Sequence, residues 1–156
     1  MTAHVLFVAD EEPNLVVFEA VCGVVFPVLP ASSVAAGLEL MKEHEIGVVL
    51  TDQRMPGMTG IELLEKVESQ YADTIRLLIT AYSDLQAAED AINRGHVRRY
   101  MRKPWEPETL RAELRDAIAL YTLNTRVKAL EQRLLDTERA YSLSVVASGL
   151  ADEMRN

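Results

Sequence analysis

Acidic, hydroxyl and basic side chains stand at the ends of four segments that have the composition of β-strands. Asp52 ends an apolar run that Pro56 and Gly57 follow, which is the pattern of a buried parallel strand with a loop at its carboxyl end. Open α/β sheets bind their ligands at that edge. Three other strand-like runs end in chemically matched residues: 5–8 before Asp10-Glu11-Glu12, 75–79 before Thr80, and 99–102 before Lys103.

If these strands are parallel, their carboxyl ends bring several carboxylates, a hydroxyl and an ammonium group together. Asp10, Glu11 and Asp52 would then repel one another, and repulsion raises carboxylate pKa values unless a cation lies among the groups. Oxygen ligands of this kind suit Mg²⁺, which keeps several waters and takes one or two carboxylates together with a phosphate. The residues therefore predict a magnesium site at this edge of the sheet.

The ordered set of motifs resembles the response-regulator receiver domain of two-component signalling. The motifs are an acidic pair, D-x-x-M-P-G-x-x-G from Asp52 to Gly60, T-A and K-P, and they cover roughly residues 4 to 120. The resemblance implies a CheY-like, flavodoxin-like (βα)5 fold with a five-stranded parallel sheet. It also implies that Asp52 accepts a phosphoryl group from a sensor histidine kinase in the presence of Mg²⁺ and slowly loses it by hydrolysis.

The resemblance further assigns roles around Asp52. Glu11, Asp52 and the backbone carbonyl of Arg54 would ligate the ion, and Asp10 would act mostly through water. Glu11 stands where the family more often has Asp, so which of the acidic residues ligates directly stays open. Lys103 would supply a positive charge to a phosphoryl oxygen, and its peptide bond to Pro104 is usually cis in the family.

Thr80 and Tyr100 are the residues that the resemblance assigns to switching. The Thr80 hydroxyl would move to bond the phosphoryl group, and the Tyr100 ring would turn into the space that is vacated. The surface of the fourth helix, fifth strand and fifth helix would then change. Taken singly, each residue has a structural alternative: Asp52 as a turn former, Lys103 as a solvated charge, Thr80 as a strand residue and Tyr100 as sheet packing.

Composition limits the class of protein. The chain has 156 residues and 49% apolar residues, which suits one packed domain with an appendage. Its net charge of -8 argues against direct nucleic-acid binding.

The single cysteine, Cys22, excludes an internal disulfide and is expected to be a buried thiol of a cytoplasmic protein. Residues 15–29 are apolar but interrupted and too short for a membrane span.

The remaining patterns predict alternating helices and strands, hence a doubly wound parallel sheet. The first helix contains Pro13 in its first turn, and a strand over residues 24–28 is expected at the sheet edge because of Pro27. Ser32 or Ser33 is expected to cap a second helix that ends near residue 43. A third helix is expected to begin at Gly60. Ser83 or Asp84 is expected to cap a fourth helix over residues 85–93. The apolar face of the first helix is predicted to comprise Leu15, Val16, Phe18, Ala20 and Val21.

A long helix is predicted from Glu108, because no Gly or Pro occurs before Gly149. Its first turns can cover the sheet with Leu110, Leu114 and Ile118. A heptad follows with a and d positions Leu120, Leu123, Val127, Leu130, Leu134, Thr137 and Tyr141. In a parallel homodimer, Arg126 and Arg133 at g positions would face Glu131 and Glu138 at e positions of the partner helix, and this pattern of opposite charges favours such a dimer. A single solvated helix is the alternative. The expected domains are 1–119, a coiled coil over 120–143, and 144–156.

Residues 147–156 resemble the start of a histidine-kinase dimerisation helix, whose phosphoacceptor box reads roughly A-x-G-x-A-H-E-x-R-N. Asp152 occupies the histidine position and cannot form a phosphohistidine. A degenerate module, a deliberate substitution and a chance match all stay open. The printed residues stop before a second dimerisation helix or an ATP-binding domain, so we expect a fragment without its C-terminal output domain, and not a kinase.

Two rival functions differ from a phosphorylated switch with a dimeric stalk. The first is a phosphorylation-independent receiver that serves as a dimerising or docking scaffold. The second is a small hydrolase of the haloacid dehalogenase type, whose nucleophile lies in D-x-D-x-T after the first strand. The residues 10–14, Asp-Glu-Glu-Pro-Asn, do not match that motif.

Overall fold

The fold is known from a computed structural model that describes residues 3–155, apart from the side chains of residues 82, 148 and 150–155. The chain divides into two compact units, Met1–Thr122 and Leu123–Asn156. The side chain of Asp152, which stands at the expected histidine position, lies outside the described residues.

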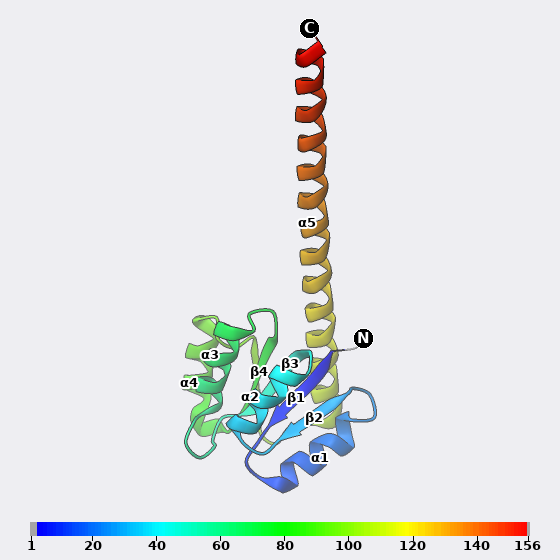
Figure 1. The fold of residues 1–156 in the computed structure, drawn as a ribbon. Helices are drawn as coiled ribbons and strands as arrows, with labels where there is room; N and C mark the ends of the chain where they lie inside the picture. Colours follow the sequence, from blue (N-terminus) through cyan, green and yellow to red (C-terminus); the bar gives the residue numbers. More distant parts are fainter. Residues whose placement is uncertain (1–2, 156) are drawn as a thin grey trace. The chain divides into compact units, whose positions relative to one another are not determined.

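A five-stranded parallel sheet forms the centre of the first unit (Figure 1). Its strand order is β2-β1-β3-β4-β5, and all registered pairs are parallel. All seven residues of β3 are buried, so the strand that ends in Asp52 is the central one. This sheet confirms the predicted fold class; its strands are β1 (His4–Val8), β2 (Val28–Ala31), β3 (Ile46–Asp52), β4 (Ile75–Thr80) and β5 (Arg99–Arg102).

Helices cover both faces of the sheet because successive strand side chains point to opposite faces. Phe7 and Leu50 pack in one hydrophobic cluster with residues of α1 and α5. Leu6 and Val49 pack in a second cluster with residues of α2, α3 and α4. The helices are α1 (Glu12–Cys22), α2 (Val34–Glu43), α3 (Gly60–Gln70), α4 (Leu85–Asn93) and α5 (Pro107–Arg155), with a short 3₁₀ helix at Tyr82–Asp84.

Side-chain caps begin two of these helices. The Ser33 hydroxyl accepts a hydrogen bond from the Ala36 N–H at 3.1 Å, which confirms the predicted start of α2. The Thr59 hydroxyl caps α3 in the same way, at 3.2 Å from the Glu62 N–H. Each cap satisfies a helix N–H that lacks an intrahelical partner.

The predicted strand over residues 24–28 is wrong. The N–H groups of Gly23, Val25 and Phe26 donate to the carbonyls of Glu19 and Cys22, so this segment is the turn that ends α1. The strand therefore begins at Val28. Its predicted place at the sheet edge is confirmed, because β2 pairs only with β1 and so tolerates Pro30 inside it.

The buried face of α1 is narrower than predicted. Leu15, Phe18 and Cys22 are buried at helical spacing, whereas Val16 and Ala20 are exposed. Cys22 is fully buried, and its burial raises the pKa of the thiol to about 11. The thiol therefore stays protonated at neutral pH, as expected for a structural cysteine.

The first turns of α5 complete the core of the first unit. Leu110 and Leu114 are fully buried, and Ile118 packs against the same cluster. Tyr121 is the last buried residue of this series, and its hydroxyl donates to the Glu45 carboxylate at 2.7 Å. Burial and this neighbouring carboxylate raise the pKa of Tyr121 to about 12.

Leu114→Ala is expected to reduce the free energy of unfolding of the first unit by about 2–5 kcal/mol, because it leaves a cavity in a closed core. Leu143→Ala makes the same substitution at a residue of α5 that is 71% exposed and should change stability by less than about 0.5 kcal/mol. Urea titration followed by the fluorescence of Trp105, the single tryptophan, measures both. Equal losses in the two variants would contradict this assignment of the core.

In the second unit, the heptad side chains are solvent-exposed. Leu123, Val127, Leu130, Leu134 and Tyr141 all belong to the exposed large hydrophobic residues. Leu120, the first predicted heptad residue, instead lies in the first unit and packs partly buried against its core. Within residues 3–155, no helix is both long and apolar enough to cross a membrane.

Candidate functional site

Asp52 ends the central strand and is only 5% exposed. Its neighbours are the ends of β1 and β4, with Val8 beside Thr51 and Ile79 beside Asp52. The loop after Asp52 is tightly closed. The Gly60 N–H donates to the Gln53 carbonyl at 2.9 Å, and a Cβ at residue 60 would collide with the Asp52 carbonyl. Only glycine therefore fits there, which explains the glycine at the end of the motif.

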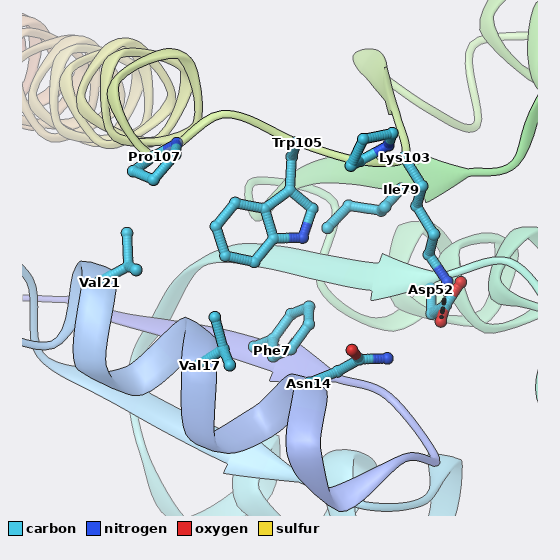
Figure 2. Close-up of a pocket in the computed structure, with 10 residues that line it drawn as sticks. Phe7, Asn14, Val17, Val21, Asp52, Ile79, Lys103, Trp105 and Pro107 are labelled. Carbon is cyan, nitrogen blue, oxygen red and sulfur yellow. Dashed lines mark hydrogen bonds and ion pairs between the residues drawn. The ribbon is translucent and has the colours of Figure 1, made fainter.

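Lys103 brings a positive charge onto this carboxylate. Its Nζ donates to Asp52 Oδ2 at 2.6 Å, a charge-assisted hydrogen bond between residues 51 apart in sequence (Figure 2). The lysine backbone is also held, because its N–H donates to the Thr80 carbonyl at 3.0 Å, and its peptide bond to Pro104 is cis. The Asp52 side chain is 8% exposed and that of Lys103 39%, so solvent reaches the site from the lysine side.

Thr80 and Tyr100 lie on the adjacent strands β4 and β5. Thr80 is fully buried at the end of β4, and its hydroxyl donates to the Ala81 carbonyl at 3.3 Å. Tyr100 is partly buried and packs against the hydrophobic cluster that contains residues of α3 and α4. In the described part of the chain, no hydrogen bond joins the Thr80 hydroxyl to Asp52. Thr80 thus lies at the carboxyl end of β4, at the same sheet edge as Asp52, and makes no direct hydrogen bond to it.

Asp10 and Glu11 follow β1 and are both solvent-exposed. Glu11 is the residue before α1, and its carboxylate accepts a weak hydrogen bond from the Asn14 side chain at 3.4 Å. Among the side chains that the structure describes, no group of three carboxylate, histidine or cysteine side chains is close enough together to hold a metal ion. The residues nevertheless suit Mg²⁺ chemically, since all are oxygen donors and β1 lies directly beside β3. Their carboxylates would have to converge when the ion binds.

An ion pair between two loops was not foreseen from the sequence. The Arg54 guanidinium donates to both Asp84 oxygens, at 2.9 and 3.3 Å, and to the Ser83 hydroxyl at 3.2 Å. The hydrogen bond and charge of Asp84 raise the pKa of Arg54. The sequence predicts Asp84 only as a possible helix cap and Arg54 only as a carbonyl ligand; Asp84 precedes α4, but its side chain makes no cap hydrogen bond. Opposite charges 30 residues apart give no local pattern from which to predict the contact.

A cavity of about 510 Å³ opens beside the Asp52–Lys103 pair. Figure 2 shows the indole ring of Trp105 on one side of it and the side chains of Phe7, Asn14 and Val17 on the other. The cavity thus lies between α1 and the segment that joins β5 to α5. Sequence reasoning gave Trp105 no role, because an aromatic residue after a K-P pair has no distinguishing periodicity.

The sequence and fold match known proteins across this first unit. The family model of the response regulator receiver domain matches residues 5–115. The hydrogenase transcriptional regulatory protein HoxA of Cupriavidus necator is 31% identical over 132 residues, which are 85% of this chain and 27% of that protein. The HoxA protein of Bradyrhizobium diazoefficiens is 29% identical over 119 residues, 76% of this chain and 24% of that protein. The chain therefore spans about a quarter of the length of these curated relatives.

Solved structures give the same result. An adenylate cyclase structure from Rhodopirellula baltica matches with a TM-score of 0.81 and 28% identity, over 85% of this chain and 98% of that one. A response regulator receiver domain protein from Clostridium thermocellum matches with a TM-score of 0.73 and 29% identity, over 78% of this chain and 98% of that one. With its sheet order and the matched residues 5–115, the chain belongs to the response regulator receiver domain family of two-component signalling.

Proposed function

We propose that this receiver accepts a phosphoryl group on Asp52 from a sensor histidine kinase. The observation that supports this most strongly is the 2.6 Å contact between Lys103 Nζ and Asp52 Oδ2 at the carboxyl edge of the sheet. A carboxylate held at a strand end, with a cation beside it and solvent on one side, can act as a nucleophile toward an anionic donor. Receiver domains in general receive phosphate from histidine kinases.

The reaction forms a bond from phosphorus to an Asp52 oxygen and breaks the bond from phosphorus to the donor. Lys103 neutralises charge on the phosphoryl oxygens, which is the main contribution that a protein can make to phosphoryl transfer. The Thr80 hydroxyl exchanges its bond to the Ala81 carbonyl for one to the phosphoryl group, and Tyr100 follows it inward. Phosphate thus favours one state by differential contacts, as a switch requires.

Asp10, Glu11, Asp52 and the carbonyl of Arg54 are the groups that would hold Mg²⁺. The ion would neutralise part of the charge of the crowded carboxylates and of the phosphoryl oxygens. Glu11 is one methylene longer than Asp and exposed, so it can extend toward the end of β3 without disturbing a packed core.

Incubation with acetyl phosphate and Mg²⁺ tests the proposal. Intact mass spectrometry should show one added phosphoryl group on the wild type. EDTA, added with the donor, should reduce the labelled fraction at least about tenfold, because affinity for the anionic donor depends on the bound cation. Unchanged labelling in EDTA would exclude the magnesium site, and a folded protein without any adduct would exclude the phosphoacceptor.

For the second unit, we propose a parallel two-helix coiled coil over residues 123–143 that transmits the switch toward a C-terminal output domain; Leu120, the first residue of the predicted heptad, packs in the first unit instead. Support comes from the exposed apolar residues of the heptad, such as Leu130 and Leu134, which are 61% and 60% exposed. A regular stripe of this kind is stabilised when a second helix covers it. The resemblance of residues 144–156 to a histidine-kinase helix stays a prediction.

Two neighbouring leucines provide a matched test of the coiled coil. Leu134→Asp places a charge at an a position and is expected to convert the dimer to a monomer. Leu135→Asp introduces the same charge one residue later, outside the a and d positions, and should leave the dimer intact. Sedimentation equilibrium measures the two dissociation constants. A wild-type monomer at high concentration, or equal effects of both variants, would contradict the parallel coiled coil.

A second candidate is a receiver that works as a scaffold without phosphorylation. It is favoured by Glu11, which lies exposed at the residue before α1 and whose carboxylate accepts a hydrogen bond from the Asn14 side chain. A scaffold would keep one oligomeric state whether or not beryllofluoride, a phosphoryl analogue, is present. A beryllofluoride-dependent change in sedimentation would therefore eliminate it.

A further inference from the structure

The cavity beside Asp52 has a polar end and an apolar end. The Asp52–Lys103 ion pair and Asn14 form the polar end. Phe7, Val17, Val21, Ile79, Pro104, Trp105 and Pro107 supply apolar walls. The phosphoacceptor is therefore itself part of the wall of a mostly apolar cavity, whose volume of about 510 Å³ lies within the range of small-molecule sites.

Aromatic packing holds the apolar walls in place. The Phe7 ring stacks on Phe18 with ring centroids 4.0 Å apart, and Trp105 meets Phe18 edge-on at 6.4 Å. Phe18 is fully buried, so both cavity rings are anchored to the core. A planar apolar group that enters between Trp105 and Phe7 would displace water from the cavity and bury its surface against the two rings. The cavity walls would not have to rearrange.

The same cavity offers a hydrogen-bond donor near the ion pair. In Figure 2 the nitrogen of the Trp105 indole lies on the side of the ring that is turned toward Asp52 and Lys103. Among the residues drawn in Figure 2, no hydrogen bond joins this N–H to a protein acceptor. A ligand that carries an oxygen between a phosphoryl group and an apolar ring would have a donor available at that oxygen.

We propose that this cavity is a leaving-group subsite, and that the receiver prefers acyl phosphates with an aromatic acyl group as small-molecule phosphodonors. The proposal rests on phosphoryl transfer to Asp52. In the reaction an Asp52 oxygen attacks phosphorus, the bond from phosphorus to the acyl oxygen breaks, and the electron pair leaves with the aromatic carboxylate. The aspartyl phosphate and a benzoate-type anion are the products. The ring stays in the cavity, and the Trp105 N–H bonds the departing oxygen.

Binding can be tested without any reaction by using phosphonates, which do not transfer their phosphorus. Benzylphosphonate should change the fluorescence of Trp105, the single tryptophan, and should bind about tenfold more tightly than methylphosphonate, a ratio typical of a small buried apolar group. The titration uses the full chain in buffer with Mg²⁺. Equal affinity for the two phosphonates would overturn the proposal, whether or not Asp52 can be phosphorylated.

Adjacent valines on α1 provide the matched variants. Val17 lines the cavity and is 50% exposed, whereas Val16 is 59% exposed and does not line it. Val17→Phe should fill part of the cavity and lower the ratio of benzyl to methyl affinity to near one. Val16→Phe adds the same ring at the neighbouring position and should keep the wild-type ratio. If the ratio of benzyl to methyl affinity fell to near one in both variants, or stayed at the wild-type value in both, the subsite would be contradicted.

Labelling kinetics then separate this inference from the proposed function. In the wild type, benzoyl phosphate should half-saturate labelling at about one tenth of the acetyl phosphate concentration, and Val17→Phe should remove this difference. Labelling by both donors with equal half-saturation would overturn the subsite and leave Asp52 as the acceptor. If neither donor labels the protein, phosphoryl transfer to Asp52 is refuted. The role of the cavity as a leaving-group subsite is then refuted as well, even if benzylphosphonate binds there.

Discussion

Asp52→Asn is expected to abolish phosphoryl labelling while the protein stays folded. An amide nitrogen replaces one carboxylate oxygen, so the side chain keeps its shape but loses the negative charge that makes it a nucleophile. The fold should tolerate the change because Lys103, the partner left behind, is 39% exposed and can be hydrated. Far-UV circular dichroism and a cooperative thermal transition verify the fold, and intact mass measures labelling.

The control for this variant is Asp116→Asn, which removes the charge of an exposed acid on α5. It should be labelled as the wild type is. Labelling of Asp52→Asn with the wild-type number of phosphoryl groups would show that another residue is the acceptor. Labelling that is lost in both variants would point to a general effect of net charge rather than to Asp52.

Lys103→Ala is expected to reduce the rate of labelling by about 10²- to 10³-fold, the usual effect of removing one electrostatic contact to a reacting group. The ammonium group lies 2.6 Å from the carboxylate and has two further N–H donors for phosphoryl oxygens. Lys103→Arg should restore only part of the rate, because the planar guanidinium is larger and directs its donors differently. Time courses with acetyl phosphate measure the three rates.

Lys42→Ala is the matched control for the lysine. Lys42 also contacts a carboxylate, that of Glu39 at 3.1 Å, but on an exposed helix surface away from the strand ends. This variant should be labelled at the wild-type rate. A rate for Lys103→Ala within about twofold of the wild type would contradict a role of this contact in stabilising transition-state charge.

Local patterns were sufficient to predict most of the fold. The alternation of apolar runs with helical periods predicted the doubly wound sheet, and Ser33 marked the start of α2 correctly. The strand expected over residues 24–28 was misplaced because valine-rich composition favours strands, whereas backbone hydrogen bonds to Cys22 and Glu19 form a turn there. These hydrogen bonds depend on the packing of the folded chain, which the local sequence pattern does not predict.

Part of the candidate site could be predicted from the sequence because it follows from the order of the strands. Parallel strands bring their carboxyl ends to one edge, so Asp52, Thr80 and Lys103 could be grouped from their positions alone. The Arg54–Asp84 ion pair and the position of Trp105 over Phe7 depend on loop conformation and side-chain packing between distant segments. Neither leaves a periodic or spaced pattern in the chain.

The identity of the phosphorylated residue is best measured at the level of peptides. Sodium borohydride reduces an aspartyl phosphate to homoserine, and trypsin releases residues 43–54, in which Asp52 is the single aspartate. After labelling with acetyl phosphate and Mg²⁺, we expect homoserine at position 52 of this peptide. Homoserine at Asp10 or another acid, with residue 52 unchanged, would contradict Asp52 as the phosphoacceptor.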